Sequence, residues 1–225
     1  MNGDDYLLSI DDLCLEFASS ATNSTTSVLR GVNLKIRAGE IYGLVGESGS
    51  GKSMTALTVM RLLPGLNAKV SRGKIKLAGV NLLDLTEQEM CCMRGKVVSM
   101  IFQEPMTCLN PVMTIGDQIA EVFKAHETDA GPLSSNECVQ QTIELLTQVG
   151  LHHPEERLNW YPHQLSGGQR QRVMIAMALA GKPELLIADE PTTALDVTVQ
   201  AQILELLKQI CRERHLAILL ITHDL

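Results

Sequence analysis

Hydrophobic and polar positions in the first part of the chain follow the two-residue period of β-strands. Alternation over residues 13–17 and again over 32–36 predicts two short strands, separated by a polar loop at 19–27. The apolar run 41–45 predicts a third strand that leads directly into a glycine-rich turn. Residues 54–63 then have a helical pattern that ends before a proline, so a helix is expected to follow that turn.

The next segment predicts a strand at 73–77, a short helix and a further strand at 97–102. Thr86 and Glu89 have the spacing of a capping box, which indicates where the helix begins, and Gly95 is suited to end it. Strands and helices therefore continue to alternate up to this point.

Helical patterns replace this alternation from Gln103 to about residue 180. After a loop that contains Pro105, Asn110 and Pro111, residues 134–137 form a second capping box. One face of the helix that follows is predicted to be apolar and to comprise Val139, Ile143, Leu146 and Val149, with Gly150 closing the helix. We expect residues 104–180 to form an inserted α-helical subdomain.

Alternation of strand and helix returns in the last part of the chain. Residues 185–188 and 216–221 are apolar throughout, and between them lies a helical stripe of Val199, Ile203, Leu207 and Ile210. Apolar strands flanked by amphipathic helices are typical of a parallel sheet that is covered on both faces. The pattern predicts an α/β fold with a mostly parallel sheet.

Composition limits the partners. With 26 acidic and 19 basic residues the formal charge is -7, which disfavours binding to a phosphate backbone, so we expect no nucleic-acid partner. The six scattered cysteines lack metal-knuckle spacing and are interpreted as reduced cytosolic thiols. The N-terminus has no signal-peptide pattern, and the longest apolar run, 173–180, is too short to cross a bilayer. We expect membrane contact only through a partner.

The glycine-rich turn matches a phosphate-binding loop between a predicted strand and a predicted helix. Its residues are Gly46, Glu47, Ser48, Gly49, Ser50, Gly51, Lys52 and Ser53. Such a loop directs backbone N–H groups and a helix N-terminus at phosphates, while Lys52 neutralises them and the hydroxyl of Ser53 binds Mg²⁺. The alternative is a glycine-rich turn without a ligand, which the strand and helix on either side disfavour.

Two carboxylates, Asp189 and Glu190, follow the apolar strand at 185–188. They lie at the carboxyl end of a strand, which is where open α/β sheets bind ligands. Asp189 is suited to hold Mg²⁺ and Glu190 to polarise an attacking water. An apolar strand that ends in Asp-Glu is common by itself, so this interpretation depends on the phosphate-binding loop.

A second glycine-containing turn precedes a predicted helix at 169–180. Leu165 is followed by Ser166, Gly167, Gly168 and Gln169, and this arrangement predicts a second anion cradle at a helix start. The chain therefore has two phosphate-binding devices, with the inserted helical region between them.

Together these motifs resemble the ATP-binding cassette (ABC) family, over essentially the whole chain. Residues 46–53 are similar to its Walker A motif, 165–169 to its signature and 185–190 to its Walker B motif. The resemblance implies one ATP-binding domain at 1–225, in which 1–103 and 181–225 form the P-loop NTPase core with a small antiparallel β-subdomain. It also implies an end to the chain earlier than in the family, whose C-terminal part is expected to be missing.

The resemblance assigns roles to further residues. Gln103 resembles the Q-loop glutamine that senses Mg²⁺ and contacts the membrane partner, and His223 resembles the switch histidine at the γ-phosphate. Ala194, Leu195 and Asp196 resemble the D-loop, in which Asp196 contributes to the nucleotide site. Phe17 resembles the aromatic residue that stacks on adenine, although a core phenylalanine is the alternative.

The family implies ATP and Mg²⁺ as cofactors. The catalytic residues are then Glu190, His223, Gln103 and Lys52, and the Mg²⁺ ligands are Ser53, Gln103 and Asp189. The implied active species is a head-to-tail pair with a second ABC ATPase subunit, either a paralogue or a second copy. Ser166 and Gly168 would serve the nucleotide of the opposite subunit.

Two stretches, 103–111 and 161–164, are similar to importers of dipeptides, oligopeptides and nickel. Cys108 differs from the serine that is usual there. The resemblance implies two transmembrane permeases, an extracytoplasmic solute-binding protein and a place on the cytoplasmic face of the bacterial inner membrane. A di- or oligopeptide importer is favoured over one for nickel, glutathione or another solute. A non-transport ABC ATPase is a second reading, but it calls for a long coiled-coil or zinc insertion between Walker A and the signature and for a basic face, and the sequence shows neither. A simple P-loop kinase or GTPase is a third reading, and it leaves the signature unexplained.

Overall fold

The computed structural model describes residues 6–19, 24–65, 67–103, 108–126, 133–193 and 195–223. Its helices and strands, in chain order, are β1 (Leu8–Ser19), β2 (Ser24–Ile36), β3 (Ile41–Val45), α1 (Lys52–Met60), β4 (Ala68–Leu77), β5 (Val80–Asn81), α2 (Glu87–Met93), β6 (Val98–Ile101), α4 (Ile115–Ala125), α5 (Ser135–Gln148), α6 (Pro154–Arg157), the 3₁₀-helix η1 (Pro162–Gln164), α7 (Gly167–Ala180), β7 (Leu185–Asp189), α8 (Val197–Arg214) and β8 (Ala217–Thr222).

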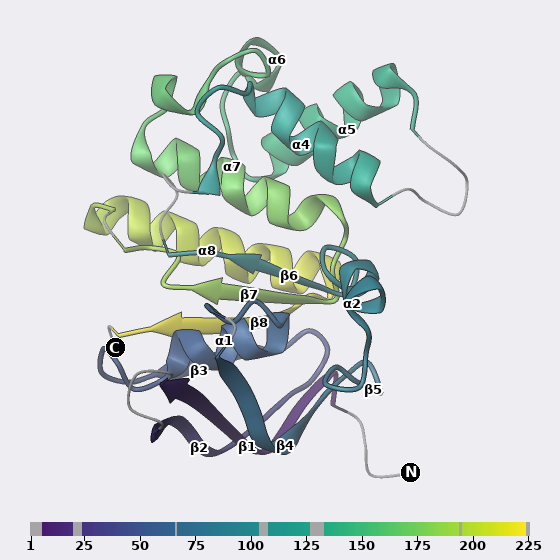
Figure 1. Ribbon diagram of the computed structural model, residues 1–225. Helices are drawn as coiled ribbons and strands as arrows, with labels where there is room; N and C mark the ends of the chain where they lie inside the picture. The colour runs from purple at the N-terminus through teal and green to yellow at the C-terminus, as the bar shows by residue number, and fades with distance from the viewer. Residues whose placement is uncertain are drawn as a thin grey trace.

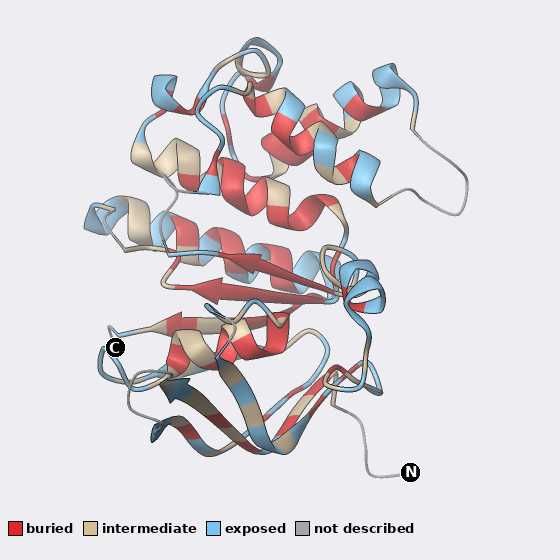
Figure 2. Ribbon diagram, viewed as in Figure 1, coloured by how far each residue is buried: buried red, intermediate tan, exposed pale blue. Residues whose placement is uncertain are grey.

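A parallel sheet in the order β3-β8-β7-β6 forms the centre of the molecule, as the apolar strands predict (Figure 1). Every residue of β7 is buried, because helices and strands cover both faces of this sheet (Figure 2). Alternate side chains of β7 therefore enter different cores. Leu186 and Ala188 pack with α8 and the helical region, whereas Leu185 and Ile187 pack with α1 and the second sheet.

The second sheet is antiparallel, in the order β2-β1-β4-β5. The prediction of a polar loop at 19–27 is wrong at its carboxyl end, because β2 begins at Ser24 and extends the hairpin. Thr25 pairs with Ala18 and Thr26 pairs with Phe17. Threonine is β-branched and suits an exposed strand, so a polar stretch that resembles a loop forms part of the ladder. Residues 20–23 lie outside the described residues.

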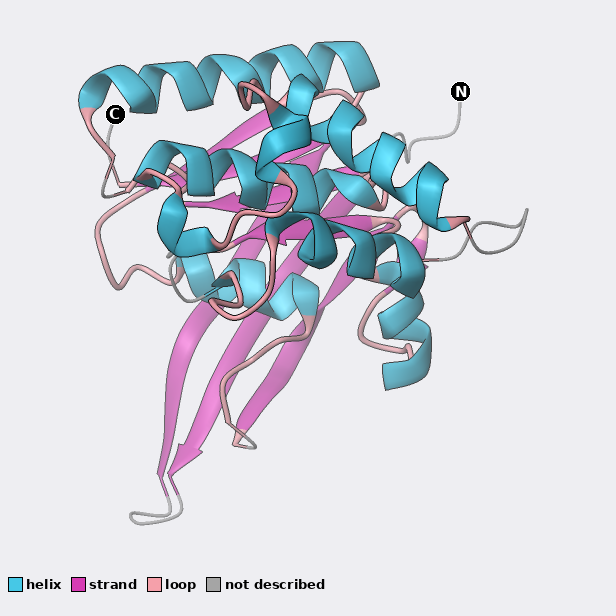
Figure 3. Ribbon diagram, turned by 90° about the horizontal axis from the view of Figure 1, so that it is seen from above, coloured by secondary structure: helices cyan, strands magenta, loops and turns pink. Residues whose placement is uncertain are grey.

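Helices α4, α5, α6 and α7 lie between β6 and β7 in the chain and gather above the parallel sheet (Figures 1 and 3). The capping boxes at Thr86 and Ser134 are confirmed, since each side chain accepts a hydrogen bond from the N–H three residues on. None of the described helices has the length and apolarity that crossing a membrane requires.

The predicted apolar face of α5 is confirmed at Leu146 and Val149, which are buried, but is wrong in the first turn. Val139 is 49% exposed, whereas its neighbour Cys138 and, one turn later, Thr142 are buried. Thr142 can be buried because its hydroxyl donates to the carbonyl of Cys138 at 2.7 Å. A polar residue with an internal partner thus occupies a position that the hydrophobic pattern assigns to solvent.

The ends of two helices also differ from prediction. Helix α1 begins at Lys52 and ends at Met60, because Arg61 has a left-handed conformation (φ 51°) that terminates it before the proline does. Helix α7 begins at Gly167 rather than Gln169. Ser166 is its N-cap and forms a capping box with Gln169, and this Ser-x-x-Gln spacing in the sequence is the signal that the predicted helix start at Gln169 did not use.

Glycine is required at position 73 of β4, because β1 and β4 approach each other closely there. A substitution at this position tests that close packing. The φ of Gly73 is +107°, and a Cβ there would lie 2.6 Å from the Cα of Leu13. We expect Gly73→Ala to lower the free energy of unfolding by about 2 kcal/mol or more, measured by chemical denaturation. Gly79→Ala is the matched control, since Gly79 also has a positive φ (+81°) but a Cβ there would meet no heavy atom of a more distant residue within 4 Å. Equal losses in both variants would contradict the proposed steric cause.

Candidate ATP-binding and hydrolysis site

The loop between β3 and α1 curls around its own lysine. Gly49 and Gly51 have φ values of +80° and +96°, which only glycine adopts without strain, and they turn the chain into the start of α1. The ammonium group of Lys52 donates to the carbonyls of Gly46, at 2.6 Å, and Glu47, at 2.9 Å. The lysine is buried, so its positive charge is held beneath the loop at the N-terminus of a helix. This arrangement is suited to phosphate.

Ser53 and Asp189 come from different elements and meet at this helix start. The hydroxyl of Ser53 donates to Oδ1 of Asp189 at 3.0 Å. Asp189 is the last residue of β7 and is 5% exposed. Burial raises the pKa of Asp189 and the charge of Glu190 adds to this, while the Ser53 hydrogen bond and Lys52 oppose it. A nearby cation would compensate this buried carboxyl group, and hydroxyl and carboxylate oxygens are ligands that Mg²⁺ prefers.

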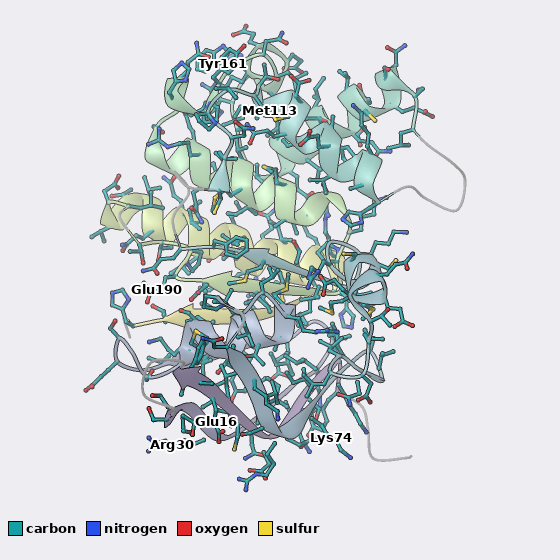
Figure 4. The ribbon with its side chains drawn as sticks, viewed as in Figure 1. Glu16, Arg30, Lys74, Met113, Tyr161 and Glu190 are labelled. Atoms are coloured by element: carbon teal, nitrogen blue, oxygen red, sulfur yellow. The ribbon has the colours of Figure 1, made fainter. Side chains whose placement is uncertain are left out.

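Glu190 directly follows β7 and lies at the carboxyl ends of the parallel strands β7 and β8 (Figure 4). Its N–H donates to the carbonyl of Ile221 at 3.0 Å, which extends the β7–β8 ladder by one residue. Its φ is +48°, a left-handed conformation that non-glycine residues adopt rarely and often at functional sites. The conformation turns the chain sharply at the point where the carboxylate leaves the sheet.

Three side chains contact the Glu190 carboxylate. Gln103 and Thr193 donate to Oε2, at 2.8 and 3.0 Å, and Nδ1 of His223 lies 3.0 Å from Oε1. Burial acts to raise the pKa of Glu190. The hydrogen bonds from His223 and Thr193 and the charges of His223 and Lys52 outweigh burial, so the pKa is lowered. The ionised form of Glu190 is therefore favoured, and this carboxylate can accept a proton or orient a water molecule.

A cavity of about 170 Å³ joins the loop to these catalytic candidates. Its lining residues are Val28, Ser48, Gly49, Gly51, Lys52, Ser53, Met54, Gln103 and Glu190. A cation, backbone N–H groups and the carboxylate of Glu190 thus converge at one site from α1 and from the segments that follow β6 and β7. The residues fit Mg²⁺ and a polyphosphate, because hard oxygen donors lie beside a positively charged helix start.

The signature turn lies outside this cavity. Ser166 is exposed, and its hydroxyl accepts from the N–H of Gln169 at 3.3 Å. Gly168 packs on the start of α8, where a Cβ would lie 2.7 Å from Cγ1 of Val199, and Gly167 lies beside Leu195, just before α8. Among the described lining residues none comes from 166–169, so the chain does not place its own signature on its own phosphate-binding loop.

Two predicted nucleotide-site residues have other contacts in the structure. Phe17 pairs with Thr26 and Ala68 and packs, partly buried, against the core of the second sheet. Asp196 is the N-cap of α8 and accepts from the N–H of Val199 at 3.0 Å. Neither Phe17 nor Asp196 is among the described residues that line the cavity, and their roles toward a nucleotide remain predictions. Ala194 of the D-loop and residues 104–107 of the Q-loop stretch lie outside the described residues.

Sequence reasoning missed three residues of this site. Val28 and Met54 line the cavity, and Thr193 contacts Glu190. Val28 adjoins the stretch that resembles a polar loop, so the hydrophobic pattern indicates no role for it. The three-residue separation of Thr193 from Glu190, immediately after the strand, is the signal that could have indicated a side-chain contact across a turn.

Comparison with known proteins agrees with the motifs and the geometry of this site. A model of the ABC transporter family matches residues 29–193. A probable peptide ABC transporter ATP-binding protein of Sinorhizobium fredii is 52% identical over 98% of this chain and 64% of that protein. An oligopeptide transport ATP-binding protein of Bacillus subtilis is 55% identical over 87% of this chain and 58% of that protein. The chain thus spans less than two thirds of the length of these relatives.

A solved structure agrees with the sequence comparison. The dimeric structure of a post-hydrolysis state of an ATP-binding cassette, bound to ADP and phosphate, has a TM-score of 0.83 and 29% sequence identity. The match covers 96% of this chain and 88% of that chain. The fold is therefore that of an ABC ATPase cassette, as the sequence motifs predict. On the family match, the relatives and the fold together, the chain belongs to the ABC transporter family, among its ATP-binding proteins.

Proposed function

We propose that this protein binds and hydrolyses ATP to energise an importer of di- or oligopeptides. The observation that carries the proposal is that Lys52, Ser53 and Glu190 line one cavity at the carboxyl ends of the parallel strands, with Asp189 hydrogen-bonded to Ser53 behind it. The curated relatives named as peptide and oligopeptide transport ATP-binding proteins support the substrate class.

Each side chain of the site has a distinct task in this proposal. Lys52 and the N–H groups of the loop bind the β- and γ-phosphates of ATP. Ser53, Asp189 and the amide oxygen of Gln103 would hold Mg²⁺. Bound Mg²⁺ would neutralise the charge that develops on the phosphate oxygens. Glu190 orients and polarises the attacking water. His223, which lies 3.0 Å from the other carboxylate oxygen, would contact the γ-phosphate.

The exposed signature turn favours a head-to-tail pair of ATPase subunits. Ser166 and the N-terminus of α7 are not among the described residues that line the chain's own cavity, so their anion-binding groups would serve a nucleotide held by another subunit. The similar cassette structures described as dimeric support this arrangement. ATP would join the two subunits, and hydrolysis would release them.

A groove beside Gln103 suits the proposed contact with a permease. It has a volume of about 220 Å³ and lies between β6, α4 and α7. Its lining is mostly apolar and includes Met100, Phe102, Leu109, Val122, Met174 and Met177. An apolar segment of a permease would bury its side chains here within a few residues of the catalytic site. We propose that the protein works from this contact at the cytoplasmic face of the inner membrane.

Reconstitution tests this function directly. The full-length protein, combined in proteoliposomes with its two permeases and solute-binding protein, is expected to hydrolyse ATP faster when a tri- to pentapeptide is supplied on the binding-protein side. Phosphate release and uptake of labelled peptide are measured together. Stimulation by nickel or glutathione but not by peptides would overturn the substrate class, and absence of ATP hydrolysis would overturn the enzymatic assignment.

A further inference from the structure

Thr193 contacts Glu190 at two points. Its N–H donates to the carbonyl of Glu190 at 3.1 Å, and its hydroxyl donates to Oε2 of the same residue at 3.0 Å. Thr193 is half-buried, so this second hydrogen bond is partly shielded from water. One residue therefore holds both the main chain and the side chain of the proposed catalytic glutamate.

The other two contacts of the carboxylate come from distant parts of the sequence. Gln103 follows β6 and is exposed, and His223 follows β8 with 44% of its side chain exposed. Their contacts with Glu190 depend on the positions of two separate segments. Thr193 is three residues from Glu190 on the same turn, so its hydrogen bond needs neither segment to be in place.

The backbone conformation of Glu190 strengthens this inference. A left-handed φ of +48° at a non-glycine residue persists only where surrounding contacts hold it. We propose that Thr193 is a positioning residue for Glu190, whose hydroxyl keeps the carboxylate in one orientation toward the cavity beside Lys52 and Ser53. This inference rests on the proposed ATPase function.

Three substitutions separate positioning from a structural role. Thr193→Val keeps the shape of the side chain but removes the donor, and we expect kcat for ATP hydrolysis to fall about three- to tenfold with KM changed less than twofold. Thr193→Ser keeps the donor and is expected to retain at least about half of the wild-type kcat. Thr192→Val is the matched control, because no described hydrogen bond joins the hydroxyl of Thr192 to Glu190 and the same chemical change is made one residue away.

The outcomes are distinct. Wild-type kcat in Thr193→Val, an equal loss in Thr193→Ser, or a rise in KM at constant kcat would each overturn the positioning role. If Thr193→Val does not fold, as judged by circular dichroism, Thr193→Ala is compared with Thr193→Ser in the same way. A Glu190→Gln variant is assayed in parallel. If the wild type itself hydrolyses no ATP, the proposed function fails. If Glu190→Gln hydrolyses ATP like the wild type, the catalytic role of Glu190 fails and the positioning role of Thr193 with it, whereas an inactive Glu190→Gln beside a fully active Thr193→Val rejects only the role of Thr193.

Discussion

Glu190→Gln is expected to lower the rate of ATP hydrolysis at least about a hundredfold while leaving ATP affinity within about twofold. Glutamine has the same shape, and its single carbonyl oxygen can still accept the hydrogen bond from Thr193 while its NH2 group takes the place of the oxygen that contacts His223, so the turn after β7 is preserved. The amide is far less basic than a carboxylate and polarises water poorly. Asp189, Ser53 and Lys52 are unchanged, so the groups that bind ATP remain. Phosphate release at saturating ATP and binding of a fluorescent ATP analogue measure the two effects separately.

Glu205→Gln provides the control for this experiment. Glu205 is an exposed residue of α8 whose carboxylate lies 3.6 Å from the ammonium group of Lys208, and the same chemical change there is expected to leave both measurements unaltered. Turnover at the wild-type rate in Glu190→Gln would show that another group activates the water. A loss of ATP affinity as large as the loss of rate would instead place Glu190 in nucleotide binding.

The sequence predicts most of the central sheet because its strands are continuous apolar runs. Residues 41–45 form β3 as expected, and 185–188 and 216–221 correspond to β7 and β8 within one residue at either end. β7 and β8 are buried on both faces, which permits no polar interruption, so the pattern identifies them without knowledge of their neighbours. β3 is an edge strand of exposed and half-buried residues, and its apolar run is recognised together with the glycine-rich turn that follows it. The exposed hairpin of β1 and β2 is different, because solvent accepts polar residues such as Thr25 and Thr26 inside a strand.

Local motifs predict the parts of the site that are contiguous in sequence. The loop at 46–53 and the pair Asp189–Glu190 are recognisable because the chemistry needs neighbouring residues. Thr193 could not be identified in this way, since its contact depends on the left-handed turn at Glu190 and a threonine side chain is common in loops. The burial of Thr142 could not be predicted for a similar reason. The carbonyl of Cys138 comes within hydrogen-bonding distance of the Thr142 hydroxyl only once α5 has formed.

Ser166→Arg is expected to prevent ATP-dependent dimerisation while leaving the affinity of a single subunit for ATP within about twofold. Ser166 is exposed at the start of α7 and is not among the described residues that line the chain's own cavity, so a larger side chain there has no direct route to its own nucleotide. In a head-to-tail pair the same arginine would occupy the space that the partner's γ-phosphate needs. The experiment is done in the Glu190→Gln background, where ATP persists, and size-exclusion chromatography with and without ATP measures the dimer.

Ser134→Arg is the matched control because Ser134 and Ser166 are both exposed N-cap residues that form capping boxes, with Glu137 and Gln169 respectively. Each substitution removes a cap worth about 1 kcal/mol, so a general loss of helix stability would affect both variants alike. We expect Ser134→Arg to dimerise with ATP and Ser166→Arg to remain monomeric. A large loss of monomer affinity for ATP in Ser166→Arg alone would show that the signature turn acts on its own chain's nucleotide, because a turn that binds only in trans cannot alter binding to an isolated subunit.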